Sequence, residues 1–305
     1  MKMKTLLKNL NPLNNRQDMP AALYVLKEVL AFLLIYGLAA VLGEVLIIGG
    51  LTVMGYDPLS GVMPGGHVAE YLKYYGFGLF LVLTMLYSKV IEKRSLKSMG
   101  FRKSGFDYIL GGTLAVLLLA IVVGTGCATG TLDFIGVSSS ANISYLIALF
   151  GGFCIQSLAE ETLCRGFLFT SLSKKVSLPL AMFVSSCAFA LGHLPTVLEA
   201  QTPFAIVGVL NLFLVSAVFT LLYQLRANIY IVSGLHGLWN FMLNGVLGLS
   251  VSGSAGNTDA LLHFQVNCEN LLTGGIYGLE ASIATTAVLG ITALILFIIT
   301  GKKEK

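Results

Sequence analysis

Long runs of apolar residues separated by short polar stretches dominate this sequence. The runs fall at about 27–54, 70–90, 107–128, 143–171, 179–200, 203–224, 228–249 and 280–300. Several of them reach the roughly 20 residues that an α-helix needs to cross the hydrocarbon core of a bilayer. The boundary between the fifth and sixth runs is weak and is marked mainly by Glu199, Gln201 and Pro203. The pattern predicts an all-α, polytopic integral membrane protein with about eight transmembrane helices.

The composition agrees with that class of protein. Of the 305 residues, 56% are hydrophobic and only 11% are charged. The surface of a soluble domain of this length needs more charge than that. We therefore expect one transmembrane domain over residues 27–300, surrounded by the lipid bilayer. It would lie between a cytoplasmic amino tail (1–26) and a cytoplasmic carboxyl tail (301–305).

Most lysines and arginines lie in the two tails and in every second connection. The connections near 55–69, 129–142, 195–203 and 250–279 hold none of these cations. Because positive residues mark the cytoplasmic face, this alternation predicts eight spans with both termini inside. The net charge of +4 therefore reflects membrane topology and does not indicate a nucleic-acid partner.

Three charged residues, Glu160, Glu161 and Arg165, lie inside the fourth run. A charge at the centre of a membrane helix costs roughly 2.5–3.5 kcal/mol, so such residues usually pair or line a cavity. Glu161 and Arg165 are at i and i+4, so they share a helix face and can pair. Glu160 lies about 100° round the helix and lacks that partner. We therefore expect Glu161 and Arg165 to support the site structurally, and Glu160 to be a free carboxylate suited to acid–base chemistry.

Two of the four histidines, His193 and His236, also fall within apolar runs. Counted from the cytoplasmic ends at about 1.5 Å per residue, Glu160 and Asn240 lie roughly 18 Å deep, His236 roughly 12 Å and His193 roughly 20 Å. These four side chains are therefore predicted to meet at one level, from three helices. The depth of His193 depends on where its helix begins, and Pro195 is expected to kink that helix just past it.

Such a group of side chains supports hydrolysis of an amide bond. Glu160 with His193 would polarise a water and remove its proton, while His236 and Asn240 would donate hydrogen bonds to the developing oxyanion. The alternative is a zinc ion held by Glu160, His193 and His236, which would activate the water itself. The usual His-Glu-x-x-His spacing of zinc proteases is absent. Both direct and zinc-assisted activation therefore remain open at this point.

The same residues form three complete motifs, in the order Glu160-Glu161-x-x-x-Arg165, Phe189-x-x-x-His193 and His236-x-x-x-Asn240. Together they resemble the motifs of the CAAX-protease and bacteriocin-processing (CPBP, or Abi) family of intramembrane proteases, which includes the type II CAAX prenyl endopeptidases. The resemblance covers about residues 143–249. It implies an eight-helix protease whose site lies in a cavity open to the cytoplasmic side, with the same roles for the four residues.

The resemblance leaves the substrate open. Eukaryotic relatives trim prenylated CAAX proteins, and many bacterial relatives are linked to bacteriocin self-immunity, peptide export or quorum-peptide processing. We therefore expect an endopeptidase of the bacterial plasma membrane that acts on a membrane-associated peptide or a lipidated protein. The alternative is a non-catalytic immunity or scaffold protein, and a transporter that uses the buried charges as an ion path is a third.

Some polar positions have no clear place in this scheme. Glu44 lies in the first run without an evident partner, and Trp239 is expected to serve packing alone. His67 and His263 are expected in outer loops. The connection 250–279 is read as a solvated loop, with a lid or a re-entrant segment as alternatives.

Overall fold

The computed structural model describes residues 9–103, 105–139 and 141–303, and most of them are helical. Residues 1–8 of the predicted amino tail and residues 304–305 of the predicted carboxyl tail lie outside the described residues. The expectation of a mostly helical chain is confirmed.

All eight apolar runs contain helix, and four of them form one continuous helix each. These four are α2 (Ala21–Val53), α5 (Gly105–Ala128), α10 (Thr202–Arg226) and α12 (Ile283–Lys303). The others are interrupted and comprise α3 (Val68–Gly76) with α4 (Gly78–Val90), α6 (Ile143–Glu161) with the π-helix η3 (Thr162–Phe169) and α7 (Thr170–Leu172), α8 (Leu178–Leu191) with α9 (Leu194–Leu198), and α11 (Ile229–Phe241) with the π-helix η4 (Met242–Val246). Short 3-10 turns are η1 (Pro58–Ser60), η2 (Leu96–Met99), η5 (Gly275–Tyr277) and η6 (Leu279–Ala281).

Within the described residues, 5 helices are long and apolar enough to cross a membrane. They are Ala21–Val53, Gly105–Ala128, Ile143–Leu172, Thr202–Arg226 and Ile283–Lys302. The chain is therefore a multi-pass membrane protein, and the count of eight spans and the cytoplasmic placement of the termini stay predictions. Three of the four interrupted runs account for the difference, because their separate helices are too short to cross a bilayer alone.

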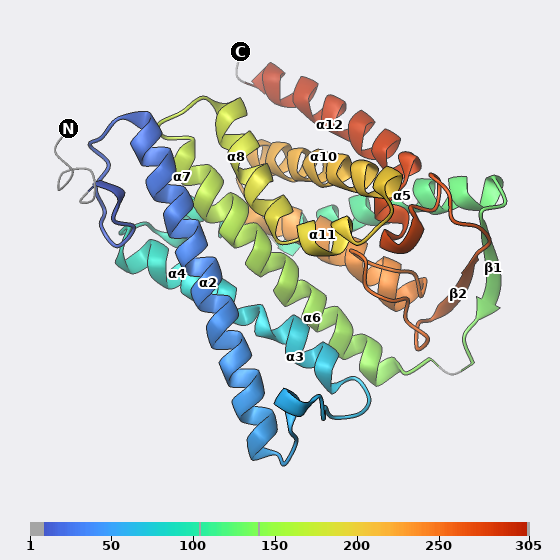
Figure 1. Cartoon of the computed structure of the whole chain (residues 1–305). Helices are drawn as coiled ribbons and strands as arrows, with labels where there is room; N and C mark the ends of the chain where they lie inside the picture. The colour runs from blue at the N-terminus through green and yellow to red at the C-terminus, as the bar shows by residue number, and fades with distance from the viewer. Residues whose placement is uncertain (1–8, 104, 140, 304–305) are drawn as a thin grey trace.

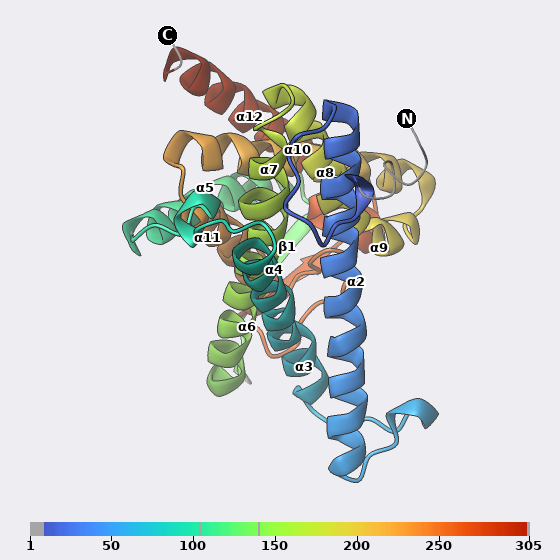
Figure 2. The ribbon, with the colours of Figure 1, turned by 90° about the vertical axis from the view of Figure 1, so that its left-hand side faces the viewer.

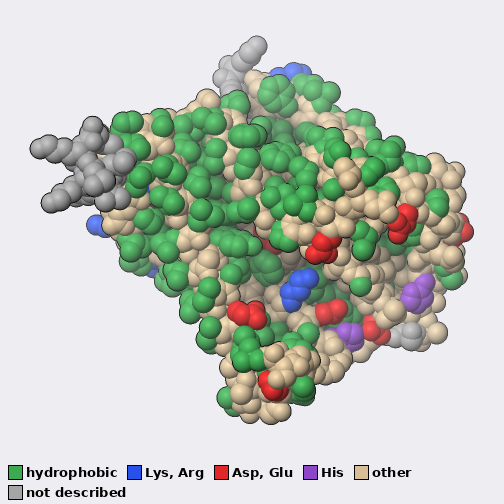
Figure 3. All heavy atoms as spheres, in the orientation of Figure 1, with side chains coloured by type: hydrophobic (Ala, Val, Ile, Leu, Met, Phe, Trp, Pro, Cys, Tyr) green, Lys and Arg blue, Asp and Glu red, His purple; other side chains and the backbone are tan. Residues whose placement is uncertain are grey.

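The helices pack around α6, which runs through the middle of the molecule (Figure 1). α2, α3 and α4 lie on one side of it, and α11, α10 and α12 lie on the other (Figures 1 and 2). α5 lies along α11, and α12 lies along α10. Apolar side chains cover most of the face seen in Figure 3, as expected for a surface in contact with lipid, and charged side chains gather around a hollow near its centre.

Glycines allow α11 to approach its neighbours closely. A Cβ atom added at Gly111 of α5 would lie 1.9 Å from the carbonyl oxygen of Ile231 in α11. On the opposite face of α11, a Cβ at Gly237 would lie 2.7 Å from Oγ of Ser157 in α6. Small residues at such crossings are typical of packed membrane helices. The consequence is that α11, which carries His236 and Asn240, is pressed against α6, which carries the two glutamates.

The connection 250–279 is folded, so its interpretation as a solvated loop is wrong. Its strand β2 (Leu262–Val266) pairs antiparallel with β1 (Leu132–Val137) from the connection 129–142, with a bulge between Phe134 and Gly136. Val251 and Tyr277 are buried against the helices. The apolar runs did not predict this small sheet, because its strands are short and lie in polar stretches. The connection therefore belongs to the packed body of the protein.

Gly111→Ala should lower the free energy of unfolding by about 1–3 kcal/mol, because the added methyl group overpacks the α5–α11 contact. Gly124→Ala, in the same helix, is the matched control, since nothing lies within 4 Å of its added Cβ. Thermal unfolding of both variants in detergent tests this. Equal midpoints for the two variants would contradict the close approach of α11.

Candidate active site

Glu161 and Arg165 form a fully buried ion pair. Arg165 Nη1 lies 2.9 Å from Glu161 Oε2, and both side chains have 0% exposure. The other arm of the guanidinium donates to the Ser216 hydroxyl at 2.6 Å. The rings of Phe189 and Phe219 lie on the guanidinium, at 4.6 and 5.1 Å. The spacing predicted this pair, and the aromatic rings around it explain how a membrane helix tolerates the charge.

Glu161 has a second partner that the sequence did not suggest. Its Oε1 atom accepts hydrogen bonds from Arg165 Nη1 and from Nδ1 of His236, each at 3.0 Å. The His236 ring also stacks on Phe219, with 5.2 Å between the ring centroids. Because a carboxylate can only accept, Nδ1 of His236 carries a proton. Glu161 therefore fixes the orientation of a candidate catalytic histidine as well as neutralising Arg165.

Glu160 projects away from this pair, as predicted, but it has polar neighbours. Gln156 Nε2 donates to its Oε1 at 3.2 Å. Its Oε2 lies 3.8 Å from Nε2 of His236, just beyond hydrogen-bond range. The Glu160 side chain is 17% exposed, in contrast to the buried Glu161. Of the two adjacent glutamates, Glu160 is the one that a substrate or a water can reach.

His193 lies at the break between α8 and α9, not within a continuous helix. α8 ends at Leu191, and α9 begins at Leu194 with Pro195 in its first turn. Nδ1 of His193 lies 3.0 Å from the backbone oxygen of Phe189. A carbonyl oxygen only accepts, so Nδ1 carries the proton and Nε2 of the neutral ring presents a lone pair. The predicted kink is thus a full interruption that leaves His193 beside the cavities described next.

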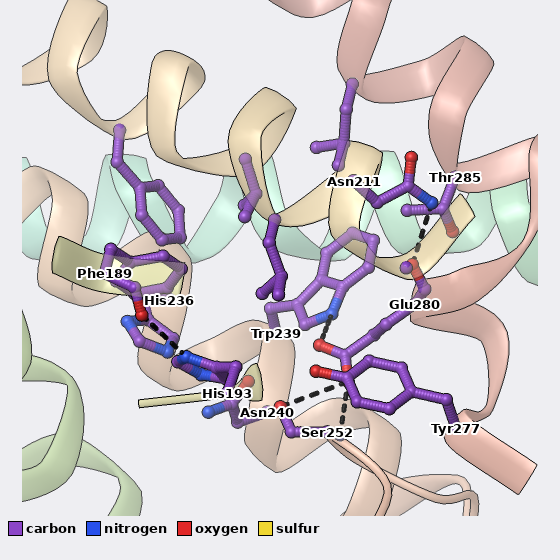
Figure 4. A pocket seen from close by; sticks show the side chains of 15 residues that line it. Phe189, His193, Asn211, His236, Trp239, Asn240, Ser252, Tyr277, Glu280 and Thr285 are labelled. Carbon is purple, nitrogen blue, oxygen red and sulfur yellow. Dashed lines mark hydrogen bonds between the residues drawn. The ribbon is translucent and has the colours of Figure 1, made fainter. Parts of the chain in front are cut away.

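Two cavities meet at His193. The first has an empty volume of about 510 Å³ including its mouth, and His236 and Asn240 are among its lining residues. The second has about 840 Å³, again including its mouth, and Glu160 lines it. Phe189, His193 and Ser252 line both. The four residues predicted to carry the chemistry therefore surround one junction, and Figure 4 shows three of them around the first cavity.

Three residues between the motif region and α12 also line the first cavity, and sequence reasoning missed them. They are Ser252 and Tyr277 of the folded connection and Glu280, which directly follows it. Trp239 Nε1 donates to Glu280 Oε1 at 3.1 Å, so Trp239 does more than pack. Burial raises the pKa of the Glu280 carboxyl, which precedes α12 and lies outside the five candidate spans. The sequence did hold a signal that Glu280 is a candidate functional residue, because it is an isolated acid at the start of an apolar run.

Other polar residues noted in the sequence lie away from this junction. His67 precedes α3, stacks on Tyr145 and lies 3.3 Å from Asp259, and His263 lies in β2. Glu44 is exposed on α2. None of these three residues lines either cavity.

The donor set proposed for zinc does not fit a metal ion in this arrangement. Among the described residues, no three side chains of His, Cys, Asp or Glu converge closely enough to hold one. We therefore derive no step through a metal.

The stretch from 142 to 242 matches the family model described as type II CAAX prenyl endopeptidase Rce1-like. This segment is about a third of the chain and contains all three motifs. The resemblance predicted from the motifs is thereby confirmed, and the family is a protease family. A comparison with curated proteins finds no match. The residues that the folded connection adds to the cavity lie outside the Rce1-like segment.

Glu161→Gln should lower the free energy of unfolding by about 3–5 kcal/mol, because it leaves the buried guanidinium of Arg165 without its counter-charge. Glu160→Gln is the matched control, since the Glu160 carboxylate is partly exposed and forms no ion pair with an arginine. Thermal unfolding of the two variants in detergent compares them. A Glu161→Gln protein as stable as Glu160→Gln would contradict the central role assigned to this pair.

Proposed function

We propose that this protein is an intramembrane endopeptidase that hydrolyses a peptide bond in a membrane-associated peptide or a lipidated protein. The observation that carries the proposal is the junction of the two cavities at His193. Glu160 lines the second cavity, His236 and Asn240 line the first, and His193 lines both, within the segment that matches a protease family.

The reaction begins with a water in the second cavity. The carboxylate of Glu160 and Nε2 of His193 accept hydrogen bonds from this water, and Glu160 takes its proton as the oxygen attacks the carbonyl carbon of the peptide. The backbone oxygen of Phe189 supports the role of His193, because it holds the neutral ring in the form whose Nε2 is a lone pair. Glu160 suits the role of base, because it is the accessible member of the two adjacent glutamates.

The carbonyl oxygen, which becomes negatively charged, then faces the first cavity. Asn240 donates to it through its amide, and His236 donates through Nε2. Since Nδ1 of His236 is already bonded to Glu161, donation by Nε2 requires the doubly protonated ring. The carboxylates of Glu160 and Glu161 on either side provide the counter-charge for that form. The C–N bond then breaks as Glu160 returns its proton to the leaving amine nitrogen.

Glu160→Gln should lower peptide hydrolysis by about 10²–10⁴-fold, because the amide cannot take the proton from water. Membrane peptidomes of cells that carry wild-type or Glu160→Gln protein identify the products that disappear. Glu199→Gln is the control, because Glu199 is exposed and lines neither cavity. Unchanged peptidomes together with unchanged function would refute the protease and favour an immunity or scaffold role.

Hydrolysis by the purified protein should survive treatment with a strong zinc chelator, since the described donors do not converge on a metal position. Metal analysis of the same preparation accompanies the assay. Loss of activity on chelation and its recovery on adding zinc would show that Glu160, His193 and His236 rearrange to form a metal site.

A further inference from the structure

Glu280 is a cavity-lining carboxylate that the proposed reaction does not use. It lies in η6 and reaches the first cavity, beside His193, His236 and Asn240. Figure 4 shows the side chains of Glu280 and Tyr277 across the cavity from His193 and Asn240. No lysine or arginine among the described residues forms an ion pair with Glu280, and none lines this cavity.

Several donors hold this carboxylate in a defined position. Trp239 Nε1 bonds to Oε1, and the backbone N–H and the hydroxyl of Ser252 both bond to Oε2. The adjoining backbone is also fixed, because Asn211 Nδ2 donates to the Glu280 carbonyl oxygen at 2.8 Å and to that of Ser282 at 3.0 Å. These contacts join α10, α11 and the folded connection. The carboxylate is thus preorganised and not a mobile surface group.

The rest of the cavity is largely apolar. Leu212 and Val215 of α10 and Leu289 of α12 line it, together with the ring of Trp239. A carboxylate in such a place is costly unless a cation neutralises it. A long basic side chain fits both the apolar walls and the carboxylate of the cavity. Its methylene stem packs on the walls while its charged end contacts the carboxylate.

We propose that this cavity is a specificity subsite that takes a lysine or arginine side chain of the peptide substrate, with the charged end of that side chain against Glu280. The proposal rests on the proposed endopeptidase function and names a class of substrate for it. His236 and Asn240 line the same cavity, so the basic residue lies close to the scissile bond. An acidic side chain is excluded by repulsion from the same carboxylate.

The alternative is that Glu280 is only an acceptor that fixes Trp239 and Ser252. The structural role and the subsite predict different substrate preferences. A purely structural acceptor confers no preference among substrate side chains. A charged subsite confers a large one, since an uncharged side chain of the same length leaves the buried carboxylate without a partner.

The experiment uses the purified full-length protein and quenched fluorescent peptides. In each set, one position at a time is lysine, arginine, norleucine or glutamate in an otherwise constant apolar sequence. At one position next to the cleaved bond, wild-type protein should cleave the lysine and arginine peptides with a kcat/KM on the order of 100-fold above that of the norleucine peptide. The glutamate peptide should be the poorest substrate.

For each variant, the kcat/KM of the lysine peptide is divided by that of the norleucine peptide. This ratio does not depend on the amount of protein or on its overall activity. Glu280→Gln should bring this ratio close to one, whereas Glu280→Asp, which keeps the charge, should preserve a preference for lysine. Glu199→Gln is the matched control and should keep the wild-type ratio, because that exposed carboxylate lines neither cavity.

A wild-type ratio near one at every position overturns the subsite while leaving the peptidase intact. A ratio that persists in Glu280→Gln overturns the assignment to Glu280. If Glu280→Gln does not fold, the wild-type ratio and the Glu280→Asp ratio still decide. Failure of wild-type protein to cleave any peptide faster than Glu160→Gln overturns the proposed function itself, and the subsite with it.

Discussion

The candidate site depends on the hydrogen bonds that the Glu161 carboxylate accepts. One of its oxygens accepts from both Arg165 and His236, so it joins α6 to α11 at a fully buried point. Remove it, and the guanidinium loses its counter-charge while the imidazole loses its orientation. The aromatic rings of Phe189 and Phe219 contact the same charged groups and keep them from lipid. In the proposed reaction, Glu160 is free to act as the base because Glu161 makes these structural contacts instead.

The uninterrupted helices could be predicted from the sequence because hydropathy alone specifies them. α5 and α10 follow their apolar runs closely. Hydropathy does not reveal interruptions, so the π-helix after Glu161 and the break before His193 were not predicted as such. The pair of Glu161 with Arg165 followed from spacing within one helix. The bond from Glu161 to His236 did not, because spacing along one helix says nothing about which residue of another helix lies opposite.

The folded connection shows a different limit of sequence reasoning. Its polar composition is typical of solvated loops, yet Tyr277 is buried and Glu280 lines the candidate site. Pairing of β2 with β1 holds this segment against the bundle, and strand pairing between two connections leaves no pattern in hydropathy. Motif matching misses it for a related reason, since the Rce1-like segment ends at residue 242. A segment that matches a family model can thus supply part of a cavity while residues outside that segment complete it.

The bond from His193 to the backbone oxygen of Phe189 has a consequence for how the site tolerates sequence change. The acceptor belongs to the main chain of α8, so replacing the Phe189 side chain leaves the atom in place. Which ring nitrogen of His193 carries the proton therefore depends on the position of the α8 backbone relative to His193, not on the side chain at position 189. Insertions or deletions in α8 are therefore more damaging to that placement of the proton than any point substitution that preserves the helix. The ring of Phe189 is constrained separately, because it lies on the guanidinium of Arg165, whereas the position of the proton on His193 depends on the length of the helix before it.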